Sequence, residues 1–195
     1  INLTKCIPHG AGLGGGSSDA ANALIALNRL WNLNMHKSVL RELAATIGSD
    51  CAFFIDGGTA LCTGRGEKVE QLPDFTGVDL VILYPNEVCP TGPVYADLSQ
   101  HLTYEPQKCY LVHDLPQGFD RKALAAMVMN RLQESALRVS AGMRRVWDET
   151  AHEQSVLVRF VSGSGSSIAF LMPDNLSAEL LSESLKVRAL GRAFA

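Results

Sequence analysis

The stretch "IPHGAGLGGGSSDAANAL", residues 7–24, decides how this sequence is interpreted. Five glycines stand within seven positions and are followed by two serines, an aspartate and an alanine-rich apolar run. Glycine loses more backbone freedom on folding than any other residue, so a loop this rich in glycine is costly to order. We therefore expect the loop either to hold a bound group or to permit unusually close packing.

The segments on either side of the loop predict an anion-binding site. Residues 1–7 roughly alternate between apolar and polar and predict a strand. From Ser18 onward, apolar residues recur at helical spacing, with Ser17 or Ser18 as the N-cap and Asp19 in the first turn. A strand, a glycine loop and a helix N-terminus together present free backbone N–H groups to a phosphate.

Three interpretations of the loop can be distinguished by its residues. A Walker A loop is excluded because no lysine stands at the required position. A dinucleotide fingerprint matches at Gly10, Gly12 and Gly15, but it requires a strand after the first helix. The next pattern here is a second helix, residues 37–47, which disfavours a dinucleotide. A tightly packed glycine turn with no ligand stays open as the alternative.

The rest of the chain predicts an α+β fold. After 37–47 come a short apolar piece and strands at 59–63 and 79–84. A proline-rich stretch at 86–118 contains only a short periodic piece around 94–98. Two helical patterns follow at 121–132 and 135–149, then strands 156–161 and 167–172, a helix from 175 or 176 to 185, and a strand-like end. That order predicts an antiparallel sheet with helices against it.

The motif P-H-G-A-G-L-G-G-G-S-S-D-A-A, residues 8–21, resembles the central motif of the GHMP kinases, named for galactokinase, homoserine kinase, mevalonate kinase and phosphomevalonate kinase. The resemblance implies a two-lobe fold, with part of a ribosomal-protein-S5-like N-terminal lobe and a ferredoxin-like α/β C-terminal lobe. It implies residues 1–85 in the ATP-binding lobe, 86–118 as a connecting segment and 119–195 in the C-terminal lobe.

Four further stretches support the resemblance, in the family's order. They are "LAATIGSDCAFFIDGGTALCTGRGE" (43–67), "CPTGPVYADL" (89–98), "MNRLQESAL" (129–137) and "SGSGSSIAF" (162–170). Two of them depart from the family pattern. Ser49 and the pair Cys51-Ala52 replace Ala and Val-Pro, and Arg131 replaces an acidic residue.

The resemblance also implies which residues form the site. It makes Asp50 the base that accepts the proton of the acceptor hydroxyl, although an aspartate there can instead cap the next short helix. It implies ATP with Mg²⁺ held by the nucleotide and water, and no protein metal site. The residues implied to bind ATP are Pro8, Gly10, Ala11, Gly12, Leu13, Gly14, Gly15, Gly16, Ser17 and Ser18. Those implied to bind the acceptor or close the site are Thr91, Tyr95, Gly163, Ser164 and Gly165.

The amino-acid sequence of the loop most resembles that of the family branch that phosphorylates the 2-hydroxyl of 4-diphosphocytidyl-2-C-methyl-D-erythritol in the non-mevalonate isoprenoid pathway. Two alternatives stay open: another acceptor, of the homoserine or mevalonate type, and a nucleotide-binding protein without catalysis. The family's catalytic lysine lies upstream of the glycine loop, and nothing in the nine residues before Gly10 matches it. We therefore expect this chain to be the central and C-terminal part of a longer protein.

The composition predicts where the protein is located in the cell and which classes of partner it binds. The net charge is −3 and the pI about 5.9, which gives no overall basic surface for nucleic acid. The five cysteines are scattered and odd in number, which favours reduced thiols over disulfides or zinc. We expect a cytoplasmic enzyme with a small-molecule substrate, no nucleic-acid or membrane partner, and a monomeric or weakly dimeric state.

Overall fold

The computed structural model describes residues 2–74, 76–101 and 120–195. It divides into two compact units, one of residues 14–76 and one of residues 1–13 with 77–195. We call them the helical unit and the sheet unit. The division falls inside the glycine loop, between Leu13 and Gly14. The predicted lobe boundaries at residues 85 and 118 stay a prediction, and much of the predicted connecting segment lies outside the described residues.

The helical unit is built on two helices and a hairpin. A small core of Ala21, Leu40, Ala44, Cys51 and Ile55 lies where the helices meet two 3₁₀ turns. The hairpin strands pair antiparallel, with Leu61 opposite Glu70. The elements are α1 (Gly15–Leu30), α2 (Lys37–Ile47), the 3₁₀ turns η1 (Ser49–Cys51) and η2 (Phe53–Ile55), β1 (Thr59–Thr63) and β2 (Lys68–Leu72).

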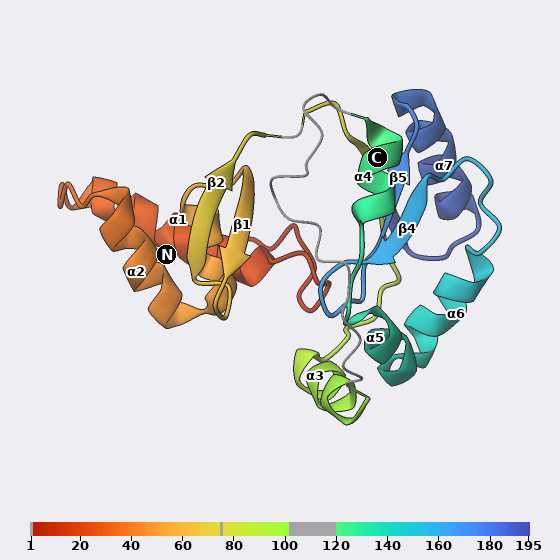
Figure 1. The fold of residues 1–195 in the computed structure, drawn as a ribbon, viewed down its shortest axis with the longest axis horizontal. Coiled ribbons are helices and arrows are strands. Elements are labelled where there is room, and N and C mark those ends of the chain that lie inside the picture. Colours follow the sequence, from red (N-terminus) through yellow and green to blue (C-terminus); the bar gives the residue numbers. More distant parts are fainter. Residues whose placement is uncertain (1, 75, 102–119) are drawn as a thin grey trace. The chain divides into compact units, whose positions relative to one another are not determined.

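The sheet unit contains a four-stranded antiparallel sheet in the order β4-β5-β3-β6. Figure 1 shows α7 lying beside this sheet, where it packs against β3, β5 and β6. The elements are β3 (Asp79–Tyr84), α3 (Thr91–Gln100), α4 (Arg121–Met127), α5 (Gln133–Val139), α6 (Ala141–Glu149), β4 (Val158–Val161), β5 (Ile168–Met172), α7 (Asn175–Val187) and β6 (Arg192–Phe194).

The core of the sheet unit follows from its apolar runs. All five residues of β5 are buried, because this strand is paired on both edges and covered on both faces. Phe170, at its centre, has no exposed surface. On the α7 side, Asp174 starts the helix by accepting a hydrogen bond from the N–H of Ser177 at 2.7 Å. The predicted α+β class with an antiparallel sheet is therefore confirmed.

Several local predictions were wrong at element ends. Residues 2–7 form no strand, because no described strand pairs with their backbone groups. The single helix predicted at 135–149 is two helices, because Ser140 is extended and caps α6 through the N–H of Met143. The short piece expected near 94–98 is the ten-residue helix α3. Strand β2 was not predicted, because its exposed polar residues break the apolar pattern.

Candidate active site

The first half of the glycine loop, Gly10–Gly12, is held by backbone hydrogen bonds. The carbonyl of Gly10 accepts from the N–H groups of Cys89 and Ser166, both at 3.3 Å. The carbonyl of Ala11 accepts from the N–H of Ser167 at 3.0 Å. These carbonyls therefore face the segment after β3 and the turn between β4 and β5.

Gly12 shows why this half needs glycine. Its φ is +73°, in the region that L side chains rarely adopt. A Cβ there would collide with the carbonyl oxygen of Ser162 and lie 2.7 Å from that of Gly165. The Ser162 hydroxyl also donates to the Gly12 carbonyl at 2.9 Å. Two backbone segments thus pass each other in direct contact, and a side chain would separate them.

The turn between β4 and β5, residues 162–167, is itself held from the side by Asn130. The amide of Asn130 donates to the carbonyls of Val161 and Gly163, each at 2.7 Å. Gln133 accepts from the N–H of Val161 at 3.1 Å. Both backbone groups of Val161 are therefore paired with side chains, on the edge of β4 that no described strand covers.

Asn130 lies in the "MNRLQESAL" stretch, for which the sequence alone predicts no role. The sequence did contain one indication of its role, however, because an asparagine just before a helix commonly hydrogen-bonds the backbone two residues further along the chain. Here Asn130 accepts from the N–H of Leu132 at 2.9 Å while its amide reaches the turn. Glu87 was missed altogether. Its carboxylate accepts from the Ser140 hydroxyl at 2.5 Å, and its carbonyl accepts from the Ser166 hydroxyl.

The second half of the loop, Gly14–Ser18, opens α1 instead. The helix begins at Gly15, earlier than predicted, with Gly14 as N-cap at φ +66° and no side-chain cap. The first intrahelical bond runs from the N–H of Ser18 to the Gly14 carbonyl at 2.9 Å. The predicted capping by Ser17 or Ser18 was wrong, because both serines lie inside the first turn.

This helix start fits a phosphate group. The N–H groups of Gly15, Gly16 and Ser17 precede the first intrahelical bond and sit at the positive end of the helix dipole. A Cβ on Gly16 would meet no atom within 4 Å, so the space beside it is open. Gly14, by contrast, packs against Phe54, whose ring would lie 2.7 Å from an added Cβ. The Phe54 ring thus packs against the N-cap residue Gly14, whereas the space beside Gly16 is open to a ligand.

Asp50 lies in η1 of the helical unit and is exposed. No side chain caps η1 or η2, so the alternative interpretation of Asp50 as a helix cap was wrong. The carboxylate lies beside the β1–β2 hairpin, where a Cβ on Gly66 would be 3.7 Å from its Oδ1. Burial, and after it the charge of Asp50, raises the pKa of the Cys62 thiol on β1.

The residues predicted to bind the acceptor lie in the sheet unit. Thr91 is the first residue of α3, and its hydroxyl is 3.0 Å from that of Ser164 in the turn. Gly163 and Gly165 belong to the same turn, and Gly165 is buried against Met143 and Cys89. Tyr95, one helical turn after Thr91, has 56% of its surface exposed. The structure thus joins Thr91 to the turn and leaves Tyr95 on an open face.

Within residues 2–74, 76–101 and 120–195, no group of three or more His, Cys, Asp or Glu side chains is arranged to hold a metal ion. In the same part of the chain, no helix combines the length and the apolar character needed to cross a bilayer.

Comparison with known proteins gives consistent matches. Residues 1–58 match the GHMP kinases N terminal domain. A 4-diphosphocytidyl-2-C-methyl-D-erythritol kinase of Polynucleobacter asymbioticus is 35% identical over 98% of this chain and 63% of its own length. The chloroplastic enzyme of Mentha piperita is 38% identical over 86% of this chain and 42% of its own length. The chain thus spans less than two thirds of these relatives.

Solved structures agree with the sequence matches. A crystal structure of 4-(cytidine 5'-diphospho)-2C-methyl-D-erythritol kinase superposes with a TM-score of 0.73 and 32% identity, covering 98% of this chain and 68% of that one. A homoserine kinase from Cytophaga hutchinsonii gives a TM-score of 0.67 at 20% identity, over 95% of this chain and 64% of that one. The second likeness concerns the fold alone.

Proposed function

Because the chain belongs to the GHMP kinase family, we propose that it carries the phosphate-binding and proton-accepting residues of an ATP-dependent kinase. The proposed acceptor is the 2-hydroxyl of 4-diphosphocytidyl-2-C-methyl-D-erythritol, the substrate named for relatives in bacteria and in peppermint. The observation that carries the proposal is the start of α1, where the first backbone N–H groups precede the intrahelical hydrogen bonds and the space beside Gly16 is open.

Phosphoryl transfer to an alcohol depends mainly on positioning and on neutralising phosphate charge. ATP supplies the phosphoryl group, and Mg²⁺ bound to it would neutralise part of its charge. The N–H groups at the start of α1 would donate hydrogen bonds to phosphate oxygens, aided by the helix dipole. The close packing of Gly10–Gly12 would keep the loop backbone in one conformation, so little order has to be gained on binding.

In this proposal Asp50 accepts the proton of the acceptor hydroxyl as that oxygen bonds to the γ-phosphorus of ATP, whose bond to the departing ADP oxygen breaks. Its exposed carboxylate is free of a capping role, which suits a base that must reach a substrate. Thr91, Tyr95 and the 163–165 turn are proposed to contact the acceptor. The described cysteines are all free thiols, which supports the proposed cytoplasmic location. A monomeric or weakly dimeric state stays a prediction.

A phosphotransfer assay on the full product of the gene that encodes this chain tests the proposal. We expect transfer from ATP to the methylerythritol substrate, with homoserine and mevalonate as poor acceptors. Asp50→Asn should lower kcat by about 10²–10⁴-fold and leave the KM for ATP nearly unchanged. Asp120→Asn is the matched control, because Asp120 caps α4 and has no proposed role in the reaction.

The outcomes separate the parts of the proposal. Wild-type turnover in Asp50→Asn would remove this residue as the base. Transfer to homoserine or mevalonate, but not to the methylerythritol substrate, would keep the kinase and change its acceptor. The absence of turnover with any of these alcohols would contradict the proposed activity.

A further inference from the structure

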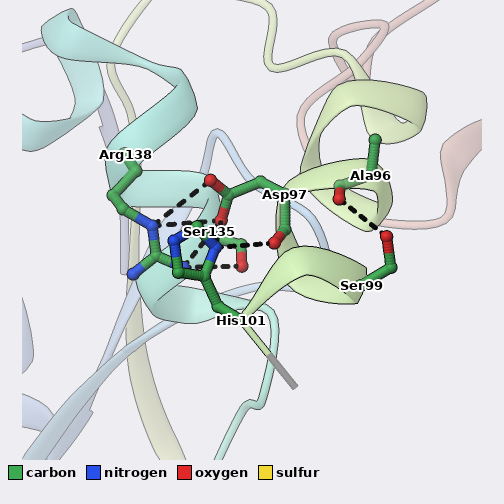
Figure 2. Close-up of polar contacts among 6 residues, drawn as sticks. All are labelled: Ala96, Asp97, Ser99, His101, Ser135 and Arg138. Atoms are coloured by element: carbon green, nitrogen blue, oxygen red, sulfur yellow. Dashed lines mark hydrogen bonds and ion pairs between the residues drawn. The ribbon is translucent and has the colours of Figure 1, made fainter. Parts of the chain in front are cut away.

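Helix α3 carries Thr91 and Tyr95, two of the residues proposed to contact the acceptor, and a cluster of charged side chains attaches it to α5. Figure 2 shows Asp97 of α3 facing Arg138 of α5, with Ser135 and His101 beside them. The Nη2 of Arg138 is 2.6 Å from Oδ2 of Asp97, and its Nε is 3.0 Å from the same oxygen and 3.3 Å from Oδ1. Two guanidinium nitrogens thus hold one carboxylate.

The surroundings of this pair make it a defined contact. Asp97 has only 20% of its side chain exposed, and Nη2 of Arg138 also donates to the hydroxyl of Ser135, a buried residue, at 3.1 Å. His101, at the end of α3, places its Nδ1 2.8 Å from the Asp97 carbonyl and 3.6 Å from its carboxylate. A fork-shaped contact fixes the orientation of both partners as well as their separation.

Because Asp97 and Tyr95 lie on the same helix, the contact that fixes Asp97 also fixes the direction in which Tyr95 points. Successive residues of a helix are about 100° apart, so Asp97 points about 160° away from Tyr95. Val94, which is fully buried, lies on the Asp97 side and faces the core. Thr91 and Tyr95 are four residues apart and lie about 40° from each other, with Thr91 about 120° from Asp97 around the helix. Rotation of α3 about its axis would therefore move Tyr95 and release Asp97 together.

From this geometry we infer that Asp97 and Arg138 are positioning residues, which set the rotation of α3 and so the placement of Thr91 and Tyr95 against the acceptor. The inference rests on the proposed function, because it assumes that these two residues contact the alcohol substrate. At its N-terminal end α3 is tied to the 162–167 turn by the Thr91 and Ser164 hydroxyls. Together with the buried Val94, these two polar attachments on different faces define the rotation of the helix.

The test measures the KM values for acceptor and ATP in Arg138→Gln and Asp97→Asn, using the full product of the gene. Each variant should raise the acceptor KM about five- to tenfold and change the ATP KM less than twofold, because small misplacements of contact groups are costly. The double variant should be no worse than either single one, since both remove the same contact. Arg138→Lys should recover only part of the loss, because lysine has no fork.

Arg144→Gln is the matched control. Arg144 pairs with Asp148 through a single 3.1 Å contact within α6, and both side chains are about half exposed. We expect this variant to have wild-type KM values. Hydrogen exchange of the α3 amides gives a readout besides activity, and it should quicken in Arg138→Gln but not in Arg144→Gln.

Three results would overturn the inference. The first is an unchanged acceptor KM in both Arg138→Gln and Asp97→Asn. The second is an equal rise in both KM values together with a lower Tm, which would mean general loosening. The third is unaltered exchange of the α3 amides. In each case the wild-type enzyme still transfers phosphate. Failure of the proposed function would instead appear as a wild-type protein that phosphorylates no acceptor.

Discussion

The two halves of the glycine loop have similar composition and different structures. In residues 10–12, the carbonyls accept hydrogen bonds from the turn and the segment after β3, and glycine permits backbone to touch backbone. In residues 14–16, glycine opens a helix, and the space beside Gly16 is empty. The first half is therefore a packing feature, and the phosphate contacts proposed above fall on the second half.

Gly12→Ala should have the largest effect on stability, because it places a side chain in the packed half of the glycine loop. An alanine at positive φ costs about 1–2 kcal/mol, and the contact with two backbone oxygens adds to this. We expect the free energy of unfolding to fall by about 2–4 kcal/mol, measured by urea denaturation. Gly77→Ala is the control, since Gly77 has φ +72° in the same unit and open space around it. Equal losses in both variants would show that packing contributes nothing.

Asn130→Ala tests whether the packed half depends on its outer support. The carbonyls of Val161 and Gly163 would each lose a 2.7 Å hydrogen bond, and we expect a loss of about 1–3 kcal/mol in urea denaturation. Asn130→Asp should be at least as harmful, because a carboxylate would face two carbonyl oxygens. Asn22→Ala, which removes an exposed local bond on α1, should change stability by less than about 0.5 kcal/mol. If Asn130→Asp were neutral, the donor role would be wrong.

Prediction from the sequence succeeded where a local pattern decides the structure. The apolar runs of β3 and β5 and the periodicity of α2 and α7 follow directly from residue order. The glycine motif located a helix start, but its serines suggested the wrong cap. Their capping preference was overridden by Gly14, which adopts positive φ against Phe54. Such a contact depends on a residue forty positions away, which no local pattern records.

The support of the site was beyond local prediction for the same reason. Asn130 reaches Val161 and Gly163, and Arg138 reaches Asp97, across more than thirty residues of sequence. Neither pair follows a helical or strand spacing, so only the folded chain brings the partners together. The division of the glycine loop between two units was equally hidden, because its residues form one unbroken motif in the sequence.

Gly16→Ala should act in the opposite way to Gly12→Ala. A methyl group there meets nothing, and alanine is the better helix former by up to about 1 kcal/mol, so stability should be unchanged or slightly higher. The same methyl would occupy the open space proposed for phosphate, and we expect the KM for ATP to rise about tenfold. Thermal unfolding and steady-state kinetics on one preparation measure both. A loss of stability with normal ATP kinetics would reverse the roles assigned to the two halves.

The smallest expected effect is a change in the reactivity of the Cys62 thiol when the charge of Asp50 is removed. Burial, and then this carboxylate, hold the pKa of the Cys62 thiol above its usual value, because a nearby negative charge disfavours the thiolate. Asp50→Asn removes the charge and leaves the burial, so the pKa should fall only partway toward that value. At pH 8 the variant should therefore hold more thiolate, and alkylation of Cys62 by iodoacetamide should quicken by less than about tenfold. Peptide mass spectrometry separates Cys62 from Cys6, which is also exposed and whose rate should not change. An unchanged alkylation rate at Cys62 would mean that the Asp50 carboxylate does not lie beside β1. This result would weaken the assignment of Asp50 as the base, and it does not depend on a measurement of turnover.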